Sequence, residues 1–141
     1  MESYFFTGLN WLAIAVAAVA YFMLGALWYS FLFKKTWIRS SGVDMNNPNA
    51  KKGAAGIMVL TLVLEFVTCI GIDILATRLS LVGGGVLSGA KLGLLTGVCF
   101  AAVAVTISYM YQMKPKVLSI VDSGYHIVGN IVAGIIICIW T

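Results

Sequence analysis

Four long apolar runs occupy most of this sequence and leave only short polar connections between them. They cover about residues 9–33, 54–76, 86–113 and 117–140. Each exceeds the roughly 18 apolar residues that mark a membrane-spanning helix, because about 20 helical residues cross a hydrocarbon core of roughly 30 Å. The runs lack the strict alternation of a membrane β-barrel. The sequence therefore predicts an all-α, integral membrane four-helix bundle that forms a single transmembrane domain over residues 1–141.

The positions of the basic residues predict which loops face the cytoplasm. Cytoplasmic loops carry the excess of lysine and arginine in membrane proteins. Here the first and third loops hold most of these residues, so we expect loops one and three in the cytoplasm and both termini outside. Loops one and three contain Lys34, Lys35, Arg39, Lys51, Lys52, Lys114 and Lys116, whereas the second loop region contains Arg78 and Lys91.

Composition and charge exclude a soluble domain and a nucleic-acid-binding protein. Hydrophobic residues make up 61% of the 141 residues and charged residues only 10%, whereas a soluble domain has about 25% charged residues. The net charge of +4 does not indicate nucleic acid, because membrane topology and anionic lipid already account for basic loops. We therefore expect the lipid bilayer to be the main partner of this chain.

The fourth run carries a polar stripe at an unusual depth. Asp122, His126 and Asn130 are spaced four residues apart, so they share one face of a helix. His126 follows Lys116 by ten residues, which places it about 15 Å into the membrane at about 1.5 Å per residue. Glu65 follows Lys52 by thirteen residues, which places it about 20 Å into the membrane by the same measure. The two helices run in the same direction, so Glu65 and His126 meet at similar depth if their helices are neighbours.

The polar residues allow three interpretations. A central carboxylate costs roughly 2.5–3.5 kcal/mol in the bilayer, so Glu65 and Asp122 should face the bundle interior. There they form a buried hydrogen-bond network with His126 and with Asn130 or Tyr125, or a proton or ion relay. A divalent metal site is the third interpretation, although the spacing is a weak metal signature. We expect Asp73, two turns beyond Glu65, to pair with Arg78 or Lys91.

The third run contains a small-residue face. Gly85, Gly89, Gly93 and Gly97 recur at every fourth position, which lines one side of a helix with residues that lack a side chain. Two helix backbones can approach closely along such a face. Packing within the chain is the simpler interpretation, and self-association of chains into a homo-oligomer is the alternative.

Motifs of enzymes, cofactors and metal sites are missing from the sequence. It has one histidine and contains no zinc-protease, serine-hydrolase, nucleotide or dinucleotide motif. Cys69, Cys99 and Cys138 are scattered singly in apolar runs, which is typical of small buried residues rather than metal ligands or disulfides. We therefore expect no enzyme, no cofactor and no resident metal.

Two parts of the sequence carry a resemblance to a known family over essentially the whole chain. The first part is Asn10-Trp11-Leu12-Ala13 with Gly25-Ala26-Leu27-Trp28-Tyr29-Ser30 and Trp37, and the second is Asp122-Ser123-Gly124-Tyr125-His126. Together they resemble the small four-helix membrane family catalogued as domain of unknown function 1761. That family usually has a proline after its Tyr-Ser pair and then a Gly-Lys pair, where this chain has Phe31 and Lys34-Lys35.

The resemblance implies a multi-pass protein of the bacterial inner membrane, and it implies no activity. It indicates a site made of Asn10, Trp28, Tyr29, Asp122, Tyr125 and His126. Our first hypothesis is a homo-oligomeric channel or transporter for a proton, small ion or small solute, in which Glu65, Asp122 and His126 handle the charge. The alternative is a non-transporting structural or accessory membrane subunit, whose protein partners the sequence does not identify and whose polar cluster serves folding alone.

Overall fold

The chain folds into helices that are long enough to cross a membrane. A computed structural model describes residues 2–44 and 46–141, without the side chains of residues 2, 3, 50 and 51, and these ranges contain no β-strand. Four helices have the length and apolar composition of membrane spans: Trp11–Leu32, Ala54–Arg78, Gly85–Tyr111 and Lys116–Ile139. Their ends differ from the four apolar runs of the sequence by at most two residues.

Two of these spans are continuous and two contain a wider turn. The continuous spans are α5 (Ala54–Arg78) and α8 (Lys116–Ile139). The first span joins α2 (Trp11–Leu27) to the π-helical segment η1 (Trp28–Leu32), and the third joins α6 (Gly85–Thr96), η2 (Gly97–Ala102) and α7 (Val103–Tyr111). Short helices α1 (Glu2–Phe6), α3 (Lys34–Ser41) and α4 (Pro48–Lys51) lie outside the spans.

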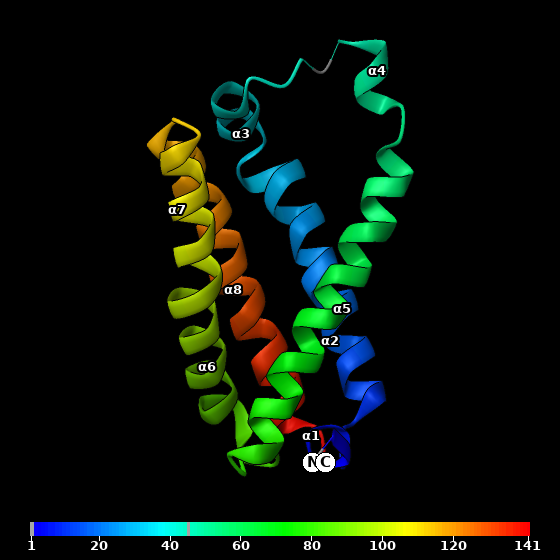
Figure 1. The fold of residues 1–141 in the computed structure, drawn as a ribbon. Helices are drawn as coiled ribbons and strands as arrows, with labels where there is room; N and C mark the ends of the chain where they lie inside the picture. Colours follow the sequence, from blue (N-terminus) through cyan, green and yellow to red (C-terminus); the bar gives the residue numbers. More distant parts are fainter. Residues whose placement is uncertain (1, 45) are drawn as a thin grey trace.

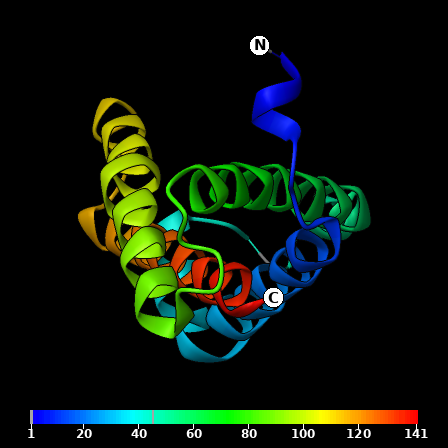
Figure 2. The same ribbon diagram turned by 90° about the horizontal axis from the view of Figure 1, so that it is seen from below.

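Helix α8 is the centre of the bundle. Half of its most apolar window is buried, compared with 17–28% for the other three spans. It packs against α6, α2 and α5 (Figure 2). Both chain termini lie at one end of the bundle, and the connection that contains α3 and α4 lies at the other end (Figure 1). Side chains of α8 therefore contact every other span.

Glycines allow α6 and α8 to approach at backbone distance. A Cβ added at Gly89 or Gly93 would collide with backbone atoms of Gly134 and Asn130 on α8, and one at Gly97 would lie 2.8 Å from the Cα of Ile127. This small-residue face is therefore occupied within one chain.

Gly85 does not belong to this contact, contrary to the sequence interpretation. It has open space where a Cβ would lie, and its φ of +85° marks the turn that begins α6. Glycine adopts this left-handed conformation without the steric cost that other residues incur. Gly85 therefore starts the helix, and it does not pack the helix against α8.

The π-helical segment η1 anchors the end of the first span to α8. Trp28 is the first residue of this segment, and its Nε1 donates a hydrogen bond of 3.0 Å to the backbone oxygen of Val121. The Trp28 ring also covers Gly124, where a Cβ would approach it to 3.1 Å. Single π turns inside α-helices are frequent at functional sites. Here the turn positions Trp28 and Tyr29 against the polar stripe of α8.

Candidate functional site

Polar side chains from all four spans converge near the middle of the bundle. Glu65 lies eleven residues after the start of α5 and thirteen before its end, and only 6% of it is exposed. Asp122 and Asn130 on α8 are also buried. His126 lies between them and is half-buried. A buried polar group is costly unless it is hydrogen-bonded, so the partners of these four side chains decide what the cluster does.

Glu65 is bound on one oxygen only. The hydroxyl of Tyr125 donates to Glu65 Oε1. The second oxygen, Oε2, is buried and has no hydrogen-bond partner among the described residues. Hydrogen bonds to a carboxylate usually saturate its oxygens when the group is buried. Glu65 therefore keeps one free acceptor in the interior of the bundle.

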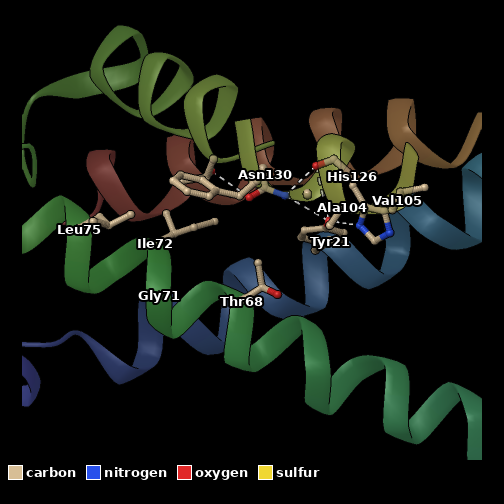
Figure 3. Close-up of a pocket in the computed structure, with 12 residues that line it drawn as sticks. Tyr21, Thr68, Gly71, Ile72, Leu75, Ala104, Val105, His126 and Asn130 are labelled. Carbon is tan, nitrogen blue, oxygen red and sulfur yellow. Dashed lines mark hydrogen bonds between the residues drawn. The ribbon is translucent and has the colours of Figure 1, made fainter. Parts of the chain in front are cut away.

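His126 and Asn130 form a second group with Tyr21 and Thr96 (Figure 3). The hydroxyl of Tyr21 lies 2.7 Å from His126 Nδ1. Asn130 Nδ2 donates to the backbone oxygen of His126 at 2.7 Å and to the Tyr21 hydroxyl at 3.3 Å. Thr96 donates to Asn130 Oδ1 at 2.9 Å. This chain of bonds joins α2, α6 and α8.

Asp122 is held by two tyrosines. Tyr29 from η1 donates to Oδ1 and Tyr109 from α7 donates to Oδ2, each at 2.6 Å. Short hydrogen bonds to a carboxylate are about twice as strong as neutral ones. Asp122 therefore ties the ends of the first and third spans to α8.

A cavity of about 350 Å³ lies among these groups. We call it the carboxylate cavity, because both Glu65 and Asp122 line it. It is bounded by α2, η1, α5, α7 and α8. Its lining residues are Tyr21, Tyr29, Thr61, Leu64, Glu65, Thr68, Val105, Tyr109, Asp122, Tyr125 and His126.

A larger cavity of about 500 Å³ adjoins the first one towards the end of the bundle that holds the chain termini. Figure 3 shows Ile72 and Leu75 of α5 on one side of it, with Tyr21, His126 and Asn130 on the other. We call it the larger cavity. Its lining residues are Tyr21, Thr68, Gly71, Ile72, Leu75, Thr96, Phe100, Ala101, Ala104, Val105, His126 and Asn130.

The carboxylate cavity has more acidic than basic side chains among its described lining residues. Two carboxyl groups line it, and no lysine or arginine is present among its described lining residues. The histidine, cysteine, aspartate and glutamate side chains of the described ranges form no group of three suited to hold a metal ion. The described lining residues therefore offer carboxyl, phenol and imidazole groups around one cavity.

The structure brings most of the candidate residues together and separates one. Glu65, Asp122, His126, Tyr125 and Tyr29 line the carboxylate cavity, and Asn130 lines the larger cavity. Glu65 and His126 are not hydrogen-bonded to each other. Glu65 is bound by Tyr125, and His126 is bound by Tyr21.

Asn10 lies away from this cluster, where it caps the first span. Its side chain accepts a hydrogen bond from the backbone N–H of Ala13 at 3.1 Å, as N-cap residues do. Its own backbone N–H donates to Asp73 at 3.0 Å. The expected pairing of Asp73 with Arg78 or Lys91 is therefore wrong, because the backbone of Asn10 binds the carboxylate and Arg78 donates to the Thr7 carbonyl at 2.6 Å.

Sequence reasoning missed Tyr21, Tyr109 and Thr96. Tyrosine near a span end is usually assigned to the interfacial aromatic belt, and Tyr21 occupies the middle of an apolar run without a polar neighbour. One feature of the sequence distinguishes two tyrosines. Tyr29 lies in Trp-Tyr-Ser and Tyr109 lies in Ser-Tyr, and each of these short motifs precedes a basic loop by a few residues. In the structure both tyrosines donate to the same carboxylate, that of Asp122.

Comparison with known proteins gives a family and no activity. No curated protein and no solved structure matches the chain. A family model described as protein of unknown function (DUF1761) matches residues 12–138, a range that includes both carboxylates, the histidine and all four tyrosines of the carboxylate cavity. The chain therefore belongs to the DUF1761 family.

Proposed function

We propose that this protein is a multi-pass membrane protein that binds a cation, in the first place a proton, in the carboxylate cavity and moves it across the bilayer. The observation that supports the proposal best is the buried carboxylate of Glu65 at mid-span, with Oε2 unpartnered among the described residues. The basic residues of the connection that contains α3 and α4, and of the connection before α8, favour an orientation with that end in the cytoplasm and both termini outside.

The physical argument concerns the charge of Glu65. A carboxylate at the centre of a bilayer costs about 2.5–3.5 kcal/mol or more. An unpaired buried charge costs much more than a neutral group, so such a group is neutralised or bound to a cation. Because no lysine or arginine among the described residues lines the cavity, the neutralising charge has to come from a proton, on Glu65 itself or on His126, or from a bound guest.

The hydrogen-bonding groups continue along the span in both directions from Glu65. Asp122 lies on one side, and His126 and Asn130 lie on the other, over eight residues of α8, or about 12 Å at about 1.5 Å per residue. Carboxyl, phenol and imidazole groups all exchange protons, and intramembrane ionisable residues commonly mark proton pathways. The carboxylate cavity connects these groups, because Glu65, Asp122 and His126 all line it.

A non-transporting scaffold is the competing function, and one observation favours it. Asn130 is hydrogen-bonded to Thr96, Tyr21 and the backbone of His126, as a residue that fixes helix register would be. Glu65 separates the two functions, because a purely structural network has no use for a buried carboxylate oxygen without a partner.

The test is dissipation of an imposed pH gradient by liposomes that contain the purified protein. Wild-type protein should collapse the gradient faster than empty liposomes do, and Glu65→Gln should lose this activity while retaining the bond to Tyr125. Asp44→Asn, which removes a carboxylate from the exposed first loop, is the matched control and should behave like the wild type. The scaffold function is correct if wild type and empty liposomes are indistinguishable. Normal conduction by Glu65→Gln would show instead that Glu65 does not carry the proton, and the proposed role of the carboxylate cavity would be wrong.

A further inference from the structure

We propose that the guest of the carboxylate cavity is an amphipathic organic cation, an amine or quaternary ammonium compound with an apolar body. This inference rests on the proposed function, because it uses Glu65 as the charge partner. It specifies the class of substrate, which the family description and the proton pathway leave open.

The volumes argue for an organic guest. A proton needs only a chain of exchangeable groups, yet the two adjoining cavities measure about 350 and 500 Å³. Small-molecule sites have volumes of roughly 300–1,000 Å³. An inorganic divalent ion would need a cluster of several ligands, and the described residues provide none.

The two cavities differ in chemistry in the way an amphipathic cation does. The carboxylate cavity is lined by Glu65 and by Tyr21 and Tyr125. The face of a tyrosine ring attracts an ammonium group that lies over it. The larger cavity is mostly apolar, with Ile72 and Phe100 among its lining residues. A guest with its charged group at Glu65 would place its body against these side chains.

The two cavities adjoin, so one molecule can occupy both. Tyr21, Thr68, Val105 and His126 line each of them. The bond between Tyr21 and His126 therefore marks the boundary between the charged and the apolar part of the site (Figure 3). A cation without an apolar body would fill only the carboxylate cavity.

The arrangement of the helices favours entry from the bilayer. The cavities lie between α5 on one side and η2 and α7 on the other. Helices α5 and α7 diverge towards the end that carries α3 and α4, as both ribbon views show (Figures 1 and 2). Amphipathic cations concentrate at the membrane interface, where anionic lipids attract them. Such a molecule would reach the site laterally.

The experiment compares two permanent cations by calorimetry on the full-length protein in lipid nanodiscs, with empty nanodiscs subtracted. Benzyltrimethylammonium has an apolar body and tetramethylammonium has none. Wild-type protein should bind the benzyl compound at least tenfold more tightly. Glu65→Gln should weaken binding of both compounds at least tenfold, because it removes the charge partner.

A second variant tests the larger cavity without touching the carboxylate. Gly71 lines that cavity, and a Cβ at this position meets open space, so Gly71→Leu should fill part of the cavity without disturbing the backbone. Binding of benzyltrimethylammonium should fall at least tenfold, whereas that of tetramethylammonium should not change. Gly56→Leu is the matched control, because Gly56 lies on the same helix, has open space around it and lines neither cavity.

The two proposals fail in different ways. If neither cation binds, or if Glu65→Gln binds both as the wild type does, the organic-cation inference is wrong. A Glu65-dependent proton flux in the liposome experiment would then still support the proposed function. Equal affinity for the two cations would also overturn the inference, because the larger cavity would then play no part in recognition.

Discussion

Tyr21 and His126, which are 105 residues apart in the sequence, are joined by a 2.7 Å hydrogen bond between the phenolic oxygen and Nδ1 of the imidazole. Gly129 makes this possible, because a Cβ there would lie 2.5 Å from the Tyr21 ring. A glycine on α8 thus admits an aromatic ring from α2 into the centre of the bundle, next to the residue that the ring binds.

Removing this hydroxyl should weaken the bundle. Tyr21→Phe leaves His126 Nδ1 without its partner and removes one acceptor of Asn130, so we expect the free energy of unfolding in mild detergent to fall by about 1–3 kcal/mol. Tyr111→Phe is the control, because Tyr111 is 87% exposed. Equal stability of the two variants would show that the bond between Tyr21 and His126 contributes nothing.

The two tyrosines on Asp122 should behave non-additively. Tyr29→Phe or Tyr109→Phe alone leaves the carboxylate one donor, and each should cost about 1.5–3 kcal/mol. The double variant leaves Asp122 with neither phenol, so its loss should exceed the sum of the single losses by about 0.5–3 kcal/mol. A thermodynamic cycle from thermal unfolding of the four proteins measures this coupling. Simple additivity would mean that the two phenols stabilise the protein independently.

The contact between α6 and α8 should not tolerate a methyl group. Gly93→Ala places a Cβ against the backbone of Asn130, so it should destabilise the protein by about 1–3 kcal/mol or more. Gly56→Ala, which meets open space, should be neutral or slightly stabilising because alanine favours helix. Thermal unfolding of the two variants measures the change in stability of each. Destabilisation of the same size in both variants would contradict this account of the contact.

The N-cap position of the first span should accept serine but not aspartate in place of Asn10. Asn10→Ala should cost about 1 kcal/mol, and Asn10→Ser should restore most of that loss. Asn10→Asp should not restore it, although aspartate is normally as good a cap as asparagine, because the Asp73 carboxylate lies 3.0 Å from the backbone nitrogen of residue 10. Melting temperatures of the three variants decide the matter, and full rescue by aspartate would show that the two carboxylates do not interact.

The sequence predicted the spans well because their length is set by the thickness of the bilayer. It also identified Glu65, Asp122 and His126, since ionisable residues inside apolar runs are rare and therefore conspicuous. The pairing of these residues was not predictable. Tyrosine is both an interfacial residue and a hydrogen-bond donor, and only the packing of α2 against α8 decides which role Tyr21 takes.

The glycine pattern correctly predicted a close helix contact through Gly89, Gly93 and Gly97, but it wrongly included Gly85. Spacing alone does not distinguish Gly85 from Gly89, because both continue the same period of four. What separates them is backbone conformation, with Gly85 in a left-handed turn at the start of α6. The sequence did not predict the π-helical segments either, because a single wide turn has no characteristic amino-acid composition.

The π turn at Gly97–Ala102 also bears on how this span evolves. A π turn generally holds one residue more than an α-helix joining the same end points. A relative one residue shorter between Gly93 and Tyr109 would therefore present an equivalent glycine and an equivalent tyrosine to α8 through an uninterrupted helix. Alignments of the family should open a single-residue gap inside this span instead of in a loop.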